Sequence, residues 1–588
     1  MPLRFSELKN RADLESAPPV KECRLLSCSP GCDTDFNINP ESICPTPMLH
    51  MDEFSELPVS GIALSEYYRD HVDGLQVVRD YDFASWAALR DGKIYQSFIP
   101  FNSGAGAVAF SDIDVAKPQY VYDPVAGAFT TELNGNYGTG YPVPYTKDRE
   151  GSDPYKGIHL FTWFQGNGAR TSNGISYITK KEGDGVVTTG AADVYTYGPT
   201  FWWRVTSNVT VPGSSEKGQL WEICDSPKPI EEGWYPWIES VRGYTDGDID
   251  KPIVAPYWCH PTYVAGTASD GIPRSQPGLT VLTTGTSYAS VTDGTFFNGK
   301  GEGYRGGDMA TMLFAIIFNV IKNATKDEEG RTQQSAGTSN TGMRGCTNYS
   351  TYNYIKSDAT DTNQLVVSVQ GYYKVGDYVS VEGKLAPSMV TAVDESTAGQ
   401  ATLTLDKTFT VAANDLLNPE VPPTGTTEVL KKWGKVDGNY GDNNGDYLHR
   451  GHQPFLFMGT EYMPGHIVLA TDVLYNADDK VLYWCRRGEP RYSDPQDVKT
   501  HYDAVPVPTD VGSGTVVDDI VVDVKRGIFT CDYTYTNYSE GWGAKYEVGR
   551  SGWCTVRLGG ARTDDFTAGF ARIHWTGTAD RVYGCVRG

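Results

Sequence analysis

The amino-acid sequence predicts an α+β chain that is mostly β. Glycine (64 residues), tyrosine (37) and tryptophan (13) are abundant, which is typical of proteins built from strands and turns. Short β-branched and aromatic runs alternate with turn clusters along most of the 588 residues. Strong helical periodicity occurs at residues 307–323, so we expect one prominent helix among many strands.

Charge and hydropathy exclude several classes of function. The net charge is −23, and the chain lacks the clustered Lys and Arg that bind phosphate backbones or anionic membranes. The longest apolar run, residues 312–321, has about half of the ~20 residues that a membrane span needs. No apolar segment of a secretory signal follows Met1. We therefore expect no nucleic-acid binding, no membrane insertion and no classical secretion.

The first 190 residues are expected to form two regions. Residues 1–60 contain four cysteines among Pro, Ser, Asn and Asp, and their lack of periodicity predicts an extended arm. Residues 61–190 alternate predicted strands, at 92–99 and 157–164, with Asn/Gly and Asp/Gly turns, and include a short helix near residues 65–71. We expect these residues to form a β-rich module.

Residues 191–588 are expected to form one C-terminal domain. Its predicted helix has an apolar face, and Asp308 is placed to cap the start. The face consists of Leu313, Ile316, Ile317, Val320 and Ile321. Aromatic strands are predicted before the helix, at residues 201–205, 221–224 and 257–263.

A small β subdomain is predicted inside this domain, at residues 364–425. Three of its segments alternate β-branched and polar residues, as half-buried strands do. They are residues 365–369, 378–381 and 401–405. A Pro- and Thr-rich segment, residues 422–427, leads back to the surrounding domain.

Several short motifs follow one another in the C-terminal domain. They are residues 199–205 (PTFWWRV), Asp225-Ser226-Pro227, His260-Pro261-Thr262-Tyr263, Gly345-Cys346, His449-Arg450-Gly451, Gly559-Gly560, Ala568-Gly569-Phe570 and Gly584-Cys585-Val586-Arg587. Their order resembles the C-type-lectin-fold domain of phage tail-fibre and receptor-binding proteins. The same fold is used by the variable proteins of diversity-generating retroelements and by formylglycine-generating enzymes.

The resemblance covers about residues 190–588, with residues 364–425 as an insertion. It implies a C-type-lectin-like domain that holds its two chain ends in one sheet and presents long loops from that frame. A strand at residues 582–586 would then pair beside a strand of residues 195–205. Loops of this kind tolerate sequence change because their backbone meets water rather than a core.

Two segments have part of the spacing of a metal site. Asp442, Asn444 and Asp446 repeat the oxygen spacing of a calcium loop, but Gln453 stands where an EF-hand has glutamate. An ordinary Asn/Gly loop is the favoured interpretation. The N-terminal cysteines have the spacing C-x4-C-x3-C-x11-C, which is compatible with one zinc ion, although ordinary thiols or local disulfides are favoured. These cysteines are Cys23, Cys28, Cys32 and Cys44. We expect no cofactor, with calcium or zinc as the alternatives.

Aromatic residues crowd the segment from residue 533 to residue 575, among Asn, Ser, Gly and Arg. Tyr and Trp supply rigid contact area, and small polar residues supply adaptable contacts, as in the binding loops of antibodies. Some of these rings are expected to be core. The residues predicted to bind a receptor are Tyr538, Trp542, Tyr546, Arg550 and Trp575.

These features together predict a virion structural protein that acts as a host receptor-binding adhesin, in a tail fibre, spike or tip. No P-loop, GxSxG or HExxH motif occurs, so we expect no enzymatic activity. The expected partners are a host surface glycan or protein, other virion proteins through the N-terminal region, and further copies of the chain, with a trimer favoured. Assembly is expected in the host cytoplasm, with release by lysis. Two alternatives stay open: a glycan-processing enzyme on the same scaffold, and a purely structural or cementing virion protein.

Overall fold

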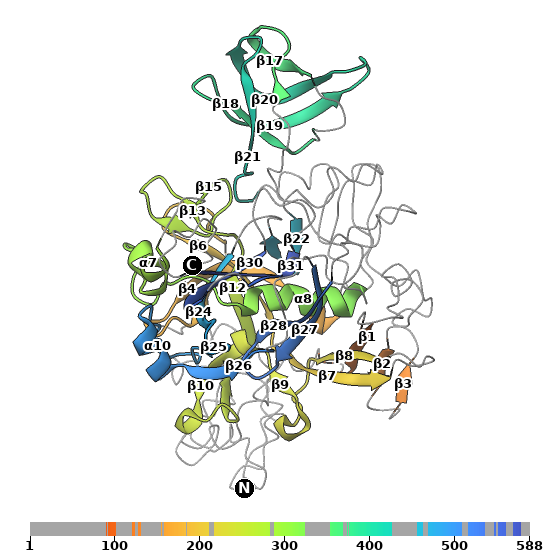
Figure 1. The fold of residues 1–588 in the computed structure, drawn as a ribbon, viewed down its shortest axis with the longest axis vertical. Helices are drawn as coiled ribbons and strands as arrows, with labels where there is room; N and C mark the ends of the chain where they lie inside the picture. Colours follow the sequence, from red (N-terminus) through yellow and green to blue (C-terminus); the bar gives the residue numbers. More distant parts are fainter. Residues whose placement is uncertain are drawn as a thin grey trace, which may run out of the picture.

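The structure is a computed structural model of the chain. It describes residues 90, 92–101, 120–123, 128–130, 155, 158–183, 185–210, 217–282, 287–323, 353–368, 373, 375–425, 455–462, 468–508, 516–535, 546–548, 551–559 and 569–577. This part of the chain is mostly β, as predicted, and its sheets surround one central helix (Figure 1). Among the described helices, none is long and apolar enough to span a membrane.

The first sheet has six strands in the order β3-β2-β1-β8-β7-β9. Strand β1 pairs antiparallel with β8 along its whole length, from Ile94 opposite Cys224 to Pro100 opposite Gly218. The predicted strands at residues 92–99, 201–205 and 221–224 are therefore confirmed. The bounds are β1 Ile94–Pro100, β2 Tyr120–Asp123, β3 Ala128–Thr130, β7 Trp202–Thr210, β8 Lys217–Cys224 and β9 Tyr235–Pro236.

A second sheet has the order β12-β6-β4-β5, with β4 Phe164–Arg170, β5 Ser176–Lys180, β6 Asp193–Pro199 and β12 Tyr257–Pro261. Strand β4 pairs with β6, and β1 of the first sheet pairs with β8. Each of the two sheets therefore contains strands from both sides of residue 190. The predicted division at this residue is therefore not a boundary between sheets. The strand predicted at residues 157–164 is instead a 3-10 turn, η4 His159–Phe161, which leads into β4.

The C-terminal sheet has the order β26-β25-β24-β30-β31-β29. A hairpin of two further strands, β27 and β28, packs beside it. The bounds are β24 Val468–Asn476, β25 Val481–Trp484, β26 Asp503–Pro506, β27 Val516–Asp523, β28 Ile528–Tyr535, β29 Tyr546–Val548, β30 Trp553–Gly559 and β31 Gly569–Gly577.

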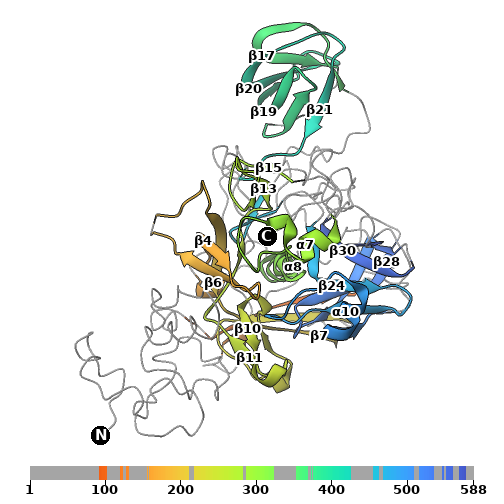
Figure 2. The same ribbon diagram turned by 90° about the vertical axis from the view of Figure 1, so that its left-hand side faces the viewer.

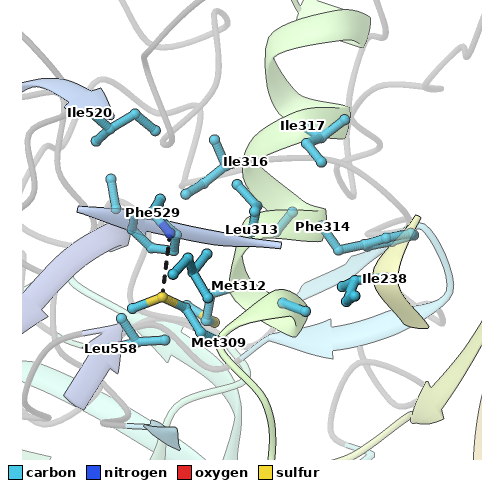
Figure 3. Close-up of a cluster of buried hydrophobic side chains, with 14 of the residues drawn as sticks. Ile238, Met309, Met312, Leu313, Phe314, Ile316, Ile317, Ile520, Phe529 and Leu558 are labelled. Carbon is cyan, nitrogen blue, oxygen red and sulfur yellow. Dashed lines mark hydrogen bonds between the residues drawn. The ribbon is translucent and has the colours of Figure 1, made fainter. Parts of the chain in front are cut away.

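Helix α8, Ala310–Asn323, confirms the one prominent helix predicted. It is buried on all sides, since every residue from Ala310 to Lys322 is buried. A helix that is apolar all round belongs in a core, so the prediction of one apolar face is too narrow. Figure 3 shows residues of α8 packed against Ile520, Phe529 and Leu558 of the C-terminal strands, with the N–H of Phe529 directed at the sulfur of Met309, 3.4 Å away.

The other described elements are short. The remaining strands of the body are β10 Val241–Tyr244, β11 Pro252–Val254, β13 Gly266–Thr267, β14 Pro273–Arg274, β15 Thr280–Val281, β22 Phe455–Phe457 and β23 Thr460–Tyr462. The short helices are α7 Tyr288–Thr292, α10 Pro495–His501, η5 Ile230–Glu232, η6 Ile238–Ser240, η7 Thr245–Gly247 and η8 Thr295–Phe297.

The inserted subdomain is a small β-barrel at residues 353–420, which stands apart from the body in Figures 1 and 2. Its strand order is β16-β21-β18-β19-β20-β17. Ile355, just after β16, bridges to Val367 of β17, so the two end strands meet and the sheet closes. The bounds are β16 Asn353–Tyr354, β17 Ala359–Val367, β18 Tyr378–Val381, β19 Leu385–Asp394, β20 Ala401–Val411 and β21 Leu416–Glu420.

The barrel has its own hydrophobic core, which consists only of residues between Ile355 and Leu417. Its return segment is anchored to the body. Thr424 exchanges backbone hydrogen bonds with residues 278 and 279, and the N–H of Gly425 donates to the carboxylate of Glu461 over 2.8 Å. The predicted insertion therefore exists, but it begins about eleven residues earlier than residue 364.

We expect the body to fold without the barrel. Replacing residues 353–420 by a short Gly-Ser linker removes a complete core and leaves the anchored residues 424 and 425 in place. The product should be soluble and should unfold cooperatively in thermal and urea melts. Deletion of residues 364–412 alone should aggregate, because it removes β18 from the edge of β21 and leaves a truncated β17 without β20. Aggregation of both products would contradict modularity.

The strand predicted at residues 582–586 lies outside the described residues, so its pairing stays a prediction. The backbone edges of residues 195–205 are largely taken by β4 and β12, which flank β6, and by β8 and β9, which flank β7. Beyond Trp203, the side of β7 that faces away from β8 pairs with no other described strand.

Candidate functional site

In the sequence, the predicted receptor-binding residues fall within or between the last strands of the C-terminal part of the chain. Tyr538, Trp542 and Arg550 lie outside the described residues. Tyr546 begins β29, and the structure describes its backbone only. The strands β29, β30 and β31 of this region are described, and their ends lie near the predicted residues in the sequence.

Two segments within residues 533–575 adjoin strand ends on the same side of this sheet. Strand β30 ends at Gly559, opposite Gly569 where β31 begins. Strand β29 runs parallel to β31 with Tyr546 opposite Ile573, so β29 begins toward that same end. In the sequence, residues 560–568 join β30 to β31, and residues 536–545 lead from β28, which is outside this sheet, to the start of β29. Arg550 falls between the end of β29 and the start of β30, which both lie toward the other end.

The prediction that Trp575 binds a receptor is wrong, because its side chain is 1% exposed. Its ring lies 4.1 Å from the ring of Tyr475, centre to centre, in the core beneath the sheet. Alternation along β31 directs this residue inward. A buried ring cannot contact a receptor, so Trp575 is part of the hydrophobic core.

The metal candidates are not supported by the described residues. Asp442, Asn444, Asp446 and the four N-terminal cysteines lie outside them. Within the part of the chain that the structure describes, no group of three or more His, Cys, Asp or Glu is placed to hold a metal ion. Burial raises the pKa of the Cys259 thiol to about 12 and that of Cys485 to about 11, so neither is a ready thiolate ligand.

A buried histidine network has the order of groups found in nucleophilic catalysis. The Nδ1 atom of His260 lies 2.7 Å from Glu239 Oε2, and its Nε2 atom lies 2.6 Å from the hydroxyl of Thr460. Hydroxyl, imidazole and carboxylate in this sequence are the groups of a catalytic triad. The carboxylate of Glu239 also accepts hydrogen bonds from Trp237 and Thr311.

In this fold the network has a structural role and not a catalytic one. His260, Glu239 and Thr460 are at most 3% exposed. The imidazole is stacked on Trp258 and meets Phe314 edge-on, with ring centres 5.2 Å away in both cases. A substrate has no approach to a hydroxyl enclosed in this way. The hydrogen bonds instead join β12, η6, α8 and β23.

A second buried cluster surrounds Asp308, at the start of α8. Its carboxylate forms ion pairs with Arg487 and Arg491, rather than serving only as a helix cap. Arg491 also donates to the carbonyl of Gly306 over 2.9 Å. Burial alone would raise the pKa of Asp308, but the charges of Arg491 and Arg487 outweigh it and the pKa is lowered.

Asp472 faces the same cluster, but its pKa is raised rather than lowered. One of its carboxylate oxygens accepts a hydrogen bond from the N–H of Met309 over 3.0 Å. Burial and the negative charge of Asp308 raise the pKa of Asp472 to about 7. Beside Asp308, Asp472 and these arginines lies a narrow cavity with room for about one water molecule.

The raised pKa of Asp472 predicts a pH-dependent stability. Between the unfolded pKa near 3.8 and the folded value near 7, the folded state holds a proton that the unfolded state has lost. Stability from this group is therefore complete below about pH 4 and falls as pH rises to 7, by at most about 1.4 kcal/mol per pH unit. The variant Asp472→Asn keeps the acceptor for Met309 and should lose this slope. Urea melts of both proteins from pH 5 to 8 measure it, and identical slopes would contradict the assignment.

Sequence reasoning missed most of these buried groups. Glu239 and Thr460 are 21 and 200 residues from His260, and Asp472 is 163 residues from Met309. No local pattern joins residues so far apart. His260 was singled out only as part of a motif and Asp308 only as a helix cap.

Comparison with protein-family models, with curated proteins and with solved structures found no match to this chain.

Proposed function

We propose that this chain is a virion structural protein that binds a receptor on the host surface through loops at one end of its C-terminal sheet. The frame would be C-type-lectin-like, as the resemblance of its motifs implies. The N-terminal region would attach the protein to the particle and to further copies of itself, and the receptor would be a surface glycan or protein.

One observation carries the proposal. The start of β29, which follows segment 536–545, lies toward the same end of the C-terminal sheet as the strand ends on either side of segment 560–568. Rings of the sheet itself, such as Trp575, are buried. The first segment holds Tyr538 and Trp542 among Ser, Gly and Ala. Small neighbours cannot cover large rings, and exposed aromatic clusters on soluble proteins mark contact sites.

A second argument concerns the acidic surface. A chain of net charge −23 gains little from general attraction to anionic cell surfaces. Specific contacts by aromatic anchors supply affinity without that attraction, because they depend on apolar area and shape.

The test is the double variant Trp542→Ala/Tyr546→Ala. We expect binding of the purified protein to cells of the particle's host to weaken by about 2 kcal/mol per anchor. The melting temperature should stay nearly unchanged, because neither ring is expected to be core. Binding is measured by titrating labelled protein on intact cells.

Trp575→Ala is the matched control, because it removes the same side chain from a buried position. This variant should lose about 3–5 kcal/mol of unfolding free energy, while its folded fraction binds normally. If the double variant behaves in the same way, its two rings are core and the receptor site lies elsewhere.

A further inference from the structure

Positive charge is concentrated near the start of α8, where three segments of chain meet. These are the turn at residues 171–174, the Gly-rich loop before Asp308, and residues 485–491. Arg170, Arg305, Arg487 and Arg491 lie here in a protein that is strongly acidic overall. Two of them, Arg487 and Arg491, share the carboxylate of Asp308.

The other two arginines form no ion pair among the described residues, although the charge of Arg170 helps to lower the pKa of Asp308. Arg170 is 8% exposed, and the one hydrogen bond found for its guanidinium runs from Nη1 to the carbonyl of Gly174, at 3.5 Å. Its Nε atom is buried without a hydrogen-bond partner, and so is Nη1 of Arg305. Burial, then the nearby charges of Arg491 and Arg170, lower the pKa of Arg305.

Glycines bring the two guanidiniums to the same turn. Gly303 has a positive φ of 78°, and a Cβ there would lie 1.8 Å from the carbonyl oxygen of Thr171, so only glycine lets the loop approach this closely. A Cβ on Gly174 would lie 3.9 Å from Nη1 of Arg305. Gly174 therefore lies beside both Arg170 and Arg305.

Among the described residues, no carboxylate of the cluster is left to balance the charge of Arg305. Asp308 is already shared by two arginines, and the proton on Asp472 is retained up to about neutral pH. A buried cation without a counter-charge is costly. Guanidinium groups bind carboxylates and phosphates through paired N–H donors. The Arg305 side chain is partly exposed, although its Nη1 atom is buried.

We propose that Arg170 and Arg305 form a binding site for a small oxyanion group, such as the carboxylate of an acidic sugar or a phosphate. Arg170 supplies the buried floor and Arg305 the solvent-facing donor. The inference stands independently of the proposed receptor function.

The test compares thermal melts of the full chain in sodium chloride, sodium phosphate and sodium glucuronate at equal pH and ionic strength. We expect the wild-type protein to melt at a higher temperature in phosphate or in glucuronate than in chloride, with a saturable dependence on concentration. Stabilisation by phosphate alone would assign a tetrahedral ligand, and stabilisation by glucuronate a carboxylate. The apparent Kd should rise roughly ten- to hundredfold in Arg305→Gln.

Arg204→Gln is the matched control, since it removes one positive charge from a similarly accessible arginine that is paired with Glu222. It should keep the response to the anion. Arg305→Lys retains the charge but loses the planar fork, so its response should be intermediate, and it serves if Arg305→Gln does not fold. Absence of any anion-specific shift in the wild-type protein would overturn the proposal. So would an undiminished shift in the Arg305 variants.

Discussion

Replacing Phe314 by alanine should destabilise the protein by about 3–5 kcal/mol, as truncation of a fully buried phenylalanine does. Phe314 lies in the middle of α8 and is 0% exposed. Its ring centre is 4.5 Å from that of Trp258 and 4.6 Å from that of Phe318. Rings from the second sheet, from the helix itself and from Trp237, just after β9, therefore meet at this side chain. Its removal leaves a cavity that several rigid neighbours cannot fill.

Urea unfolding measures the loss, and two variants serve as controls. Phe314→Leu keeps most of the volume and should cost less than the alanine variant. Tyr354→Ala removes an aromatic ring that is 47% exposed and should change stability by less than about 0.5 kcal/mol. A cost below about 1 kcal/mol for Phe314→Ala would show that the contacts around α8 are not as described.

Replacing Asp308 by asparagine should also cost about 3–5 kcal/mol, for an electrostatic reason. The change preserves size but leaves Arg487 and Arg491 buried with a neutral partner. Because the charged form of Asp308 is favoured in the fold and its pKa is lowered, the stability it supplies is present above the unfolded pKa near 3.8. That stability is lost as pH falls through the folded pKa. The difference between wild type and variant should therefore shrink in strong acid.

The matched control is Asp503→Asn, which breaks a more accessible ion pair with Arg486. Partly exposed pairs contribute about 0–1 kcal/mol, so this variant should be close to wild type. A double variant that combines Asp308→Asn with Arg487→Met should recover part of the loss, because it removes one unpaired cation. Equal costs for the Asp308 and Asp503 variants would contradict the burial argument.

Much of the fold followed from local sequence. The strands β1, β7, β8 and β12, the helix α8 and the inserted β subdomain were all predicted, because side-chain periodicity and turn residues act over a few positions. The order of these elements and the mostly β class follow from the same signals. The aromatic composition of residues 533–575 and the strong negative charge are likewise properties of the sequence alone.

Tertiary structure decided which strands pair and which side chains are buried, because no local pattern contains this information. Sheets cross residue 190 because β1 and β4 pair with strands that come later in the chain, and strand pairing depends on partners rather than on periodicity. α8 is buried on every side, since sheets pack around the whole helix and not only around its most regular face. Trp575 is core, although its neighbours in the sequence have the composition of a surface.

The contacts between buried polar groups are the clearest case that sequence patterns do not predict. His260 meets Glu239 and Thr460, and Asp308 meets Arg487 and Arg491, only when distant segments fold together. The sequence by itself determined which elements form and which residue types they carry. Which charges are paired, which are left without a counter-ion and which rings are covered depended on long-range packing, because burial and electrostatic balance are properties of the assembled core.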